Sequence, residues 1–298
     1  MTAQVHVSHD YNIFTRSHAR SRQRSLSLFS LDVMSITRWL LVLLPAVLLA
    51  QGEDDGRLAA RADGLPPQIE TVGMYPLSGS VYVAEDSHYA KTNYAVYIGA
   101  ASVTVVGAGW SPDTAKLLAQ EIRKATNKPI SDVILPDHDP EYAGGISYWK
   151  RMGVNIVSTE LTEETLKRDW VKAAKFTRKY FPTYPSLPLV LPTRTYKTDF
   201  TLENGNIRGF YLGPSHNADD IFVYFAREKV LYAGSILKEH LGNLAFANLE
   251  EYPKTLQKLH QLNLDIDKII SGHWSPVHGP ELIDEYLGML KEHSETGH

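Results

Sequence analysis

The sequence predicts an α/β fold, in which short buried strands alternate with amphipathic helices. Short apolar runs rich in Val, Ile and Tyr recur from about residue 80 to the C-terminal region. Several of these runs precede segments with apolar residues three or four positions apart, the spacing of a helix that buries one face. The composition, with 43% hydrophobic and 21% charged residues among 298, is typical of a globular protein with a sizeable core.

The predicted strands are runs in which Val, Ile, Tyr and Phe are continuous or alternate with polar residues. They cover residues 80–86, 93–99, 101–109, 133–135, 155–159, 221–225, 229–237 and 267–274. A further hairpin is expected around Asn204-Gly205, because both residue types readily adopt the left-handed conformation that a two-residue turn needs.

Each long helix is predicted from a capping residue at its start. Ser111, with Pro112 at the first helical position, begins a helix that Pro129 should end. Thr162, followed by acidic residues, begins a long helix that continues to Tyr180. The other predicted helices end near residue 152, run from the capping box of Asn248 and Glu251 to Leu262, and cover residues 280–293.

A hydrophobic segment at residues 39–50 predicts an N-terminal export signal. It is shorter than the roughly 20 residues of a membrane-spanning helix, Arg38 precedes it, and polar residues follow it. A start at Met34 would give this signal ordinary proportions; an uncleaved anchor or a transit peptide is the alternative. We expect a leader and linker over residues 1–64 and one domain over residues 65–298. The protein should be secreted or periplasmic, with no stable membrane span after signal removal.

The charge balance and the absence of cysteine exclude several kinds of site. The 30 Lys and Arg against 34 Asp and Glu give a formal charge of −4. The chain therefore lacks the excess positive charge that binds the phosphate backbone of nucleic acid. We therefore expect no nucleic-acid partner, and separately a small-molecule substrate and a monomer. The chain has no Cys, so it cannot form a disulfide, a thiol nucleophile or a thiolate zinc site. A metal ion would have to be held by His, Asp or Glu.

Asp137, Asp139 and Glu141 occupy alternate positions after a predicted strand. In an extended or turn segment, alternate side chains point to the same side, so the three carboxylates could converge on one cation while His138 points away. The alternative is a solvated acidic turn in which Glu141 stabilises the start of the following helix. Taken alone, the cluster favours this simpler interpretation.

Three further loops place polar side chains between or after predicted strands. They carry His216, Ser235 and His273. In layered α/β proteins, ligands converge at loops of this kind. A single His after a strand is more often structural, but several such loops in one chain strengthen the prediction of a functional site.

The order of these motifs resembles the metallo-β-lactamase superfamily, and most closely its mono-zinc carbapenemase subclass, typified by the Aeromonas enzyme. The motifs are the acidic cluster with Ala-Gly-Gly at 143–145, Gly-Pro-Ser-His at 213–216, Tyr-Ala-Gly-Ser-Ile-Leu-Lys-Glu at 232–239 with Leu-Gly-Asn-Leu at 241–244, and Ser-Gly-His at 271–273. The likeness extends from about Ile69 to Lys291. It implies a four-layer αβ/βα sandwich, with two sheets back to back, helices outside and a metal site at one edge.

The resemblance places metal ligands at two groups of positions. The first loop of the superfamily reads His-x-His-x-Asp, or Asn-x-His-x-Asp in the subclass, and these positions fall on Asp137, Asp139 and Glu141. His216 and His273 match the next and the last histidine ligands. Ser235 stands where the family has a cysteine.

Two metal sites follow from this register: Asp137, Asp139 and His216, and Glu141, Ser235 and His273. One or two zinc ions are expected. Serine is a weaker ligand than a thiolate, and an oxygen-rich set shifts the preference toward harder ions, so manganese or iron are alternatives.

The same register implies a substrate site and a reaction. Lys238 matches a lysine that holds the substrate carboxylate, and Asn243 an asparagine that polarises the lactam carbonyl. Asp139 or Glu141 could be the general base. The resemblance thus implies a metal-dependent hydrolase that opens a β-lactam, or a related cyclic amide or ester, by metal-activated water. The alternatives are a lactone or thioester hydrolase of the same fold and a non-catalytic binding protein that has lost its metal.

Overall fold

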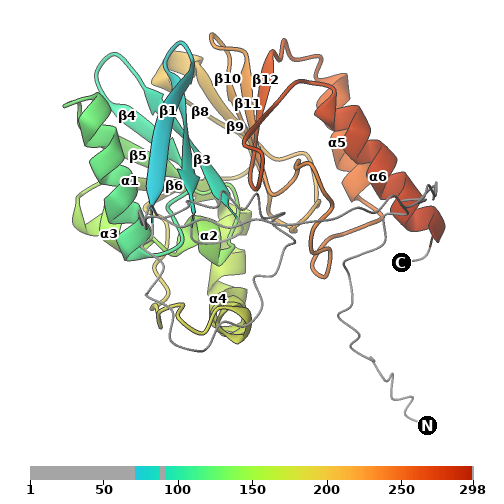
Figure 1. Cartoon of the computed structure of the whole chain (residues 1–298), viewed down its shortest axis with the longest axis horizontal. Helices are drawn as coiled ribbons and strands as arrows, with labels where there is room; N and C mark the ends of the chain where they lie inside the picture. Colours follow the sequence, from blue (N-terminus) through green and yellow to red (C-terminus); the bar gives the residue numbers. More distant parts are fainter. Residues whose placement is uncertain (1–70, 88–90, 297–298) are drawn as a thin grey trace, which may run out of the picture. The chain divides into compact units, whose positions relative to one another are not determined.

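Two β-sheets pack face to face between helices (Figure 1). This computed structural model describes residues 71–87 and 91–296, which belong to one compact unit. The predicted leader, its export signal and the proposed start at Met34 lie outside the described residues. No helix in the described part of the chain is both long and apolar enough to cross a membrane.

The first sheet has seven strands in sequence order. Neighbours among its first four strands are antiparallel, and the later neighbours are parallel. The strands are β1 (Val72–Ser78), β2 (Val81–Asp86), β3 (Thr92–Ile98), β4 (Val103–Val106), β5 (Ile130–Ile134), β6 (Asn155–Thr159) and β7 (Arg194–Tyr196). The sequence prediction lacked β1 and β7, and it made β4 too long and β5 too short.

The second sheet has six strands in the order β13-β12-β11-β10-β9-β8. They are β8 (Phe200–Leu202), β9 (Ile207–Phe210), β10 (Phe222–Phe225), β11 (Val230–Gly234), β12 (Lys268–Ser271) and β13 (Val277–His278). The predicted hairpin is present between β8 and β9. Its turn is a single 3₁₀ turn, Glu203–Gly205, in which all three residues have positive φ.

The inner faces of the two sheets share one hydrophobic core. Val83 and Val96 of the first sheet and Phe225 and Tyr232 of the second belong to the same buried cluster. Tyr97 of β3 stacks on Phe225 of β10, with ring centroids 5.9 Å apart. Burial of apolar surface between the sheets, worth about 25 cal/mol per Å², holds the strand ends of one sheet next to those of the other.

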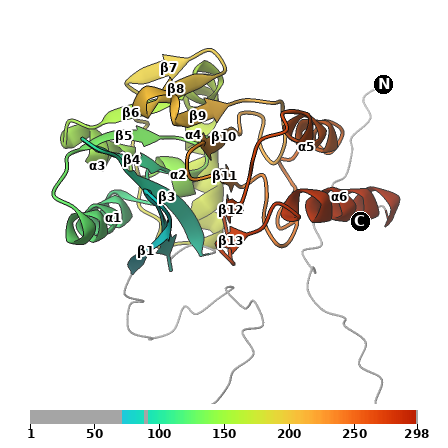
Figure 2. The ribbon, with the colours of Figure 1, turned by 90° about the horizontal axis from the view of Figure 1, so that it is seen from above.

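Helices cover the outer faces, and Figure 2 shows them on opposite sides of the sheets. On the first sheet lie α1 (Pro112–Ala125) and α3 (Ile146–Arg151), and on the second lie α5 (Tyr252–Gln261) and α6 (Leu282–Thr296). Two more helices, α2 (Pro140–Ala143) and α4 (Glu160–Tyr180), lie toward the lower end of the sheets in Figure 1. The fold is therefore the predicted αβ/βα sandwich.

The helix caps correct two details of the sequence prediction. Ser111 caps α1 as expected, accepting bonds from the amides of residues 113 and 114. The cap of α4 is Thr159 rather than Thr162, because the Thr159 hydroxyl accepts from the Thr162 amide at 3.1 Å. Asn248 caps the turn before α5 through a 3.0 Å bond from the amide of Glu251, and Glu251 itself is the N-cap of the helix.

Candidate functional site

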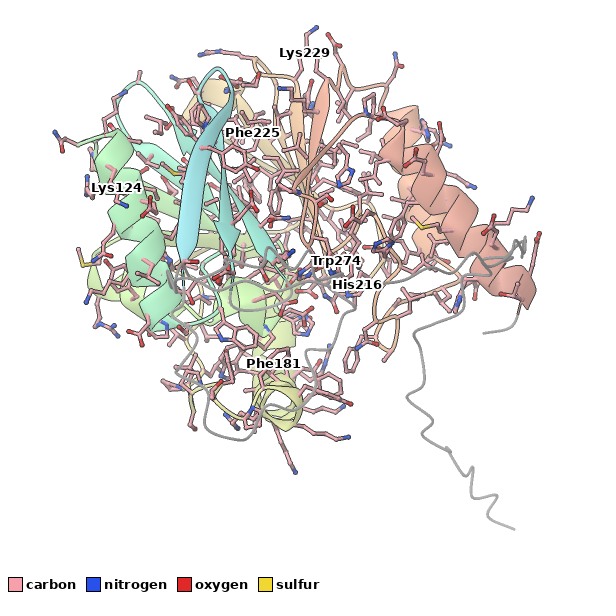
Figure 3. All side chains as sticks on the ribbon, viewed as in Figure 1. Lys124, Phe181, His216, Phe225, Lys229 and Trp274 are labelled. Carbon is pink, nitrogen blue, oxygen red and sulfur yellow. The ribbon has the colours of Figure 1, made fainter. Side chains whose placement is uncertain are left out.

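The predicted site residues lie in loops at one end of the two sheets. The loops follow β5, join β9 to β10, follow β11 and follow β12. Figure 3 shows His216 and Trp274 at this end, and Lys229, at the opposite end of β11, far from them. Parallel pairing of β11 with β12 places the loops that carry Ser235 and His273 at the same sheet edge.

The loop after β5 turns its acidic side chains inward. Asp137 is buried and its Oδ1 accepts a 2.7 Å hydrogen bond from the Asp139 amide, which closes a tight local turn. Asp139 has extended backbone angles and is the N-cap of α2. Glu141, in the first turn of α2, is only 7% exposed. Asp137 and Glu141 are therefore not solvated, which contradicts one part of the simpler interpretation, whereas its other part, an acidic helix start with Glu141 in the first turn, is present.

His138 lies between two carboxylates instead of pointing away from them. Its Nδ1 is 2.7 Å from Asp219 Oδ1, and its Nε2 is 3.9 Å from Asp139 Oδ1. Burial lowers the pKa of His138, but the hydrogen bond and the negative charge of Asp219 outweigh it and raise the pKa to about 9. The protonated imidazole thus forms an ion pair that joins the β5 loop to the β9–β10 loop.

The β9–β10 loop contributes three site residues that sequence reasoning missed: Asn217, Asp219 and Asp220. Asp220 Oδ2 accepts from the Ser215 hydroxyl at 2.7 Å and from the Asn217 amide at 2.6 Å. The Asn217 side chain donates to Asp139 Oδ2 at 2.7 Å. The sequence did contain an indication of them: Asp219 and Asp220 are adjacent and come immediately before a fully apolar strand. Carboxylates buried at such a position need hydrogen-bond or charge partners, because an unpaired buried charge is costly.

His216 and Lys238 meet inside the site. Lys238 Nζ lies 3.2 Å from His216 Nδ1 and donates to the Ser235 carbonyl at 2.8 Å. Lys238 is 2% exposed, and burial lowers its pKa to about 8, although the nearby carboxylates, Asp220 first, act in the opposite direction. Burial, followed by the charge of Lys238, holds the pKa of His216 well below its ordinary value.

His273 is placed beside Glu141. The two side chains approach to 3.8 Å between Nε2 and Oε1, and both residues are 7% exposed. The backbone of His273 forms an isolated bridge to Thr92, which ties the β12 loop to the first sheet. Burial, then the charge of Asp139, raises the pKa of Glu141 to about 8.

Asn243 is apart from these buried groups. Its residue is exposed, and its Oδ1 accepts a 2.9 Å bond from the Ala245 amide in the loop after β11. The amide group of the side chain, with two donor hydrogens, has no partner among these contacts. The described structure therefore brings the predicted residues of the four loops into neighbouring pairs and leaves Asn243 at the surface.

Comparison with known proteins agrees with this arrangement. The model of the metallo-beta-lactamase superfamily matches residues 90–273, which is more than half of the 298-residue chain. The chain belongs to this superfamily. It is a metallo-β-lactamase-like hydrolase.

Individual members of the superfamily are similar over most of their length. A metallo-beta-lactamase type 2 of Elizabethkingia meningoseptica is 27% identical over 225 residues, 68% of this chain and 84% of the relative. A metallo-beta-lactamase type 2 of Bacillus sp. (strain 170) is 24% identical, over 68% of this chain and 76% of the relative. The solved structure of TMB-1 superposes with a TM-score of 0.65 at 17% identity, covering 76% of this chain and 100% of TMB-1.

The superfamily implies a bound metal, and the folded residues can be tested against that role. The described residues contain no group of three or more His, Asp or Glu side chains arranged to hold a metal ion. Several predicted ligands are engaged with protein partners: Asp139 with Asn217, and His216 with Lys238. As folded, the residues therefore do not fit a metal site, and we derive no catalytic step through a metal.

Proposed function

We propose that this metallo-β-lactamase-like protein hydrolyses a β-lactam or a related cyclic amide or ester. One observation carries the proposal: the four loops of the predicted site lie at one end of the two sheets, with Glu141 beside His273. Membership of the superfamily and the type 2 metallo-beta-lactamases among its relatives support the same reaction class. The closer resemblance to the mono-zinc subclass also remains a proposal.

Glu141 is the best placed of the proposed general bases. Its carboxylate lies 3.8 Å from the His273 imidazole, in the buried part of the site. Asp139, the other candidate, has one carboxylate oxygen bonded to Asn217 and the second 3.9 Å from His138. We therefore assign Glu141, in its ionised form, as the base that accepts the proton of the attacking water. Its pKa of about 8 means that this form increases as the pH rises toward and above 8.

Asn243 is proposed to orient the substrate carbonyl. The bond from the Ala245 amide fixes its Oδ1, which leaves the amide group available to a carbonyl oxygen at the surface of the site. Removing a single donor to a developing oxyanion typically slows catalysis by about 10² to 10³.

The expected metal is one or two zinc ions, or else manganese or iron. Whether hydrolysis needs a metal is tested by varying the metal supply. Asp137, Asp139 and His216, or Glu141, Ser235 and His273, would have to turn toward a common point to bind one. The hydrolysis assay is therefore run with a chelator, with no addition and with added zinc.

A lactone hydrolase is the second candidate, and the position of Lys238 favours it. The resemblance assigns this lysine to the substrate carboxylate, but the residue is 2% exposed and its ammonium contacts His216 and Ser235. A lactone without a carboxylate would not need that contact.

The full chain should turn over at least one of a penicillin, a carbapenem and an acyl lactone. Glu141→Gln should reduce this turnover by 10² or more, because the amide cannot accept the proton. Glu292→Gln, an exposed control in α6, should leave it unchanged. Absence of turnover for all three substrates in all three metal conditions would refute the proposal.

A further inference from the structure

A buried lysine occupies the centre of the site. Lys238 is 2% exposed, and lysine is almost never fully buried unless its charge is paired. Its two hydrogen-bond partners are the Ser235 carbonyl at 2.8 Å and His216 Nδ1 at 3.2 Å. Both partners belong to residues that the resemblance assigns to metal coordination, so the ammonium contacts one member of each expected metal site.

The contact with Lys238 removes the coordinating capacity of His216. An ammonium carries three donor hydrogens and no lone pair, so Nδ1 must be the acceptor in this contact. In a neutral imidazole whose Nδ1 accepts, the proton is on Nε2. Neither ring nitrogen of His216 then has a free lone pair, and a metal ion cannot bind this side chain while the contact persists.

The ammonium also supplies the positive charge that the surrounding carboxylates require. Asp220, Glu141, Asp139 and Asp137 all act on Lys238 electrostatically, in that order of strength. Three of these residues are buried. Ser235, where the family has a thiolate, adds no negative charge. A cation in this position repels a second cation and competes with it for the same carboxylates.

We propose that the Lys238 ammonium is the resident cation of this site, and that its charge and its contact with His216 exclude zinc from the folded protein. This inference concerns the same site as the proposed hydrolysis but does not depend on it. Zinc binding and substrate turnover are separate measurements, so either proposal can fail alone.

The test is a titration of the full chain with zinc chloride by isothermal calorimetry. Lys238→Met keeps an unbranched side chain that is shorter by one atom and removes its charge, and it should bind zinc at least tenfold more tightly than the unaltered protein. Lys238→Arg keeps a cation and should bind zinc as weakly as the unaltered protein. Lys254→Met is the control, because this exposed lysine pairs only with the nearby Glu250 and Glu251 in the described structure.

Two results would overturn the inference. One is stoichiometric zinc binding by the unaltered chain at micromolar concentration. The other is a Lys238→Met protein that folds and binds zinc no more tightly. If this variant does not fold, ¹⁵N NMR of the His216 ring decides the question on the unaltered chain. We expect an Nε2-protonated ring whose signals stay in place with one equivalent of zinc, and a zinc-induced shift of either nitrogen would contradict the proposal.

Discussion

Gly144, in the Ala-Gly-Gly motif after α2, offers a sharp test of how the acidic loop is held. Its backbone angles, φ −61° and ψ −31°, suit any residue, so a substitution tests space alone. A Cβ atom here would lie 1.9 Å from the Trp110 carbonyl oxygen and 2.6 Å from its carbon. Real Cβ contacts are essentially never below 3.0 Å, so Gly144→Ala must separate these backbones by about 1 Å.

The cost of that separation can be worked from the hydrogen bonds it stretches. Gly145 donates to the Gly109 carbonyl at 2.8 Å, and Ala108 donates to the Tyr142 carbonyl at 2.7 Å. A displacement of about 1 Å takes both beyond hydrogen-bonding distance. Losing two bonds at about 1 kcal/mol each, plus about 1–3 kcal/mol for overpacking, predicts a loss of about 3–5 kcal/mol of unfolding free energy.

Urea unfolding of the full chain measures this loss, and Gly288→Ala is the matched control. Gly288 lies within α6, and no heavy atom lies within 4 Å of the place that a Cβ would take there. Alanine at this position should therefore stabilise the protein by up to about 1 kcal/mol through helix propensity. The two identical substitutions should change stability in opposite directions. A Gly144→Ala protein within about 0.5 kcal/mol of the unaltered chain would refute the packing argument.

Two further predictions concern the charges of the site. A double-mutant cycle with His138→Gln and Asp219→Asn should give a coupling energy of about 2 kcal/mol in urea unfolding, and a coupling below about 0.5 kcal/mol would contradict the ion pair. The unfolding free energy should fall as the pH rises from 5.5 to 7.5. Burial raises the pKa of Glu141 to about 8 and that of Asp220 to about 7, and the Asp219 bond outweighs burial to raise the pKa of His138 to about 9. Through this range the folded forms of these groups together hold more protons than the unfolded chain does, which costs about 1.4 kcal/mol per extra proton and pH unit. Thermal unfolding across this range checks the sign, and greater stability at pH 7.5 would contradict it.

Much of the fold could be predicted from local sequence patterns, because central strands such as β4, β10 and β11 are largely apolar runs that are buried on both faces. β1 escaped prediction for a physical reason. It is an edge strand in which only Val72 is buried and the other residues are exposed or half-buried, and its register shifts after Pro76, so no alternation is visible. β7 has only three residues, Arg194–Tyr196, which are too few to show a strand pattern in the sequence. It is a strand because it pairs with β6, which is distant in the sequence.

The sequence also predicted that the candidate site residues lie in loops at strand ends, as the structure shows, but it did not predict their partners. Strand ends and the family register pointed to His216 and His273, whose roles stay a prediction. The side-chain direction of His138 was mispredicted, because alternation assumes a regular extended chain and the Asp137–Asp139 turn breaks it. Lys238 and His216 are 22 residues apart, and no local pattern indicates their 3.2 Å contact.

The altered residues of the site form one consistent electrostatic arrangement. Where the superfamily pattern has histidines, this chain has Asp137 and Asp139, and Asp219 and Asp220 add two more buried carboxylates nearby. Two internal cations face this negative charge: His138, paired with Asp219, and Lys238. Two cations do not balance all of these carboxylates, and burial with mutual repulsion raises the pKa of Asp137 well above its ordinary value. A divalent ion would therefore have to displace protons from these carboxylates and the Lys238 ammonium from among them. Crowding carboxylates in a buried loop thus opposes metal binding, because it raises their pKa values and draws in the lysine.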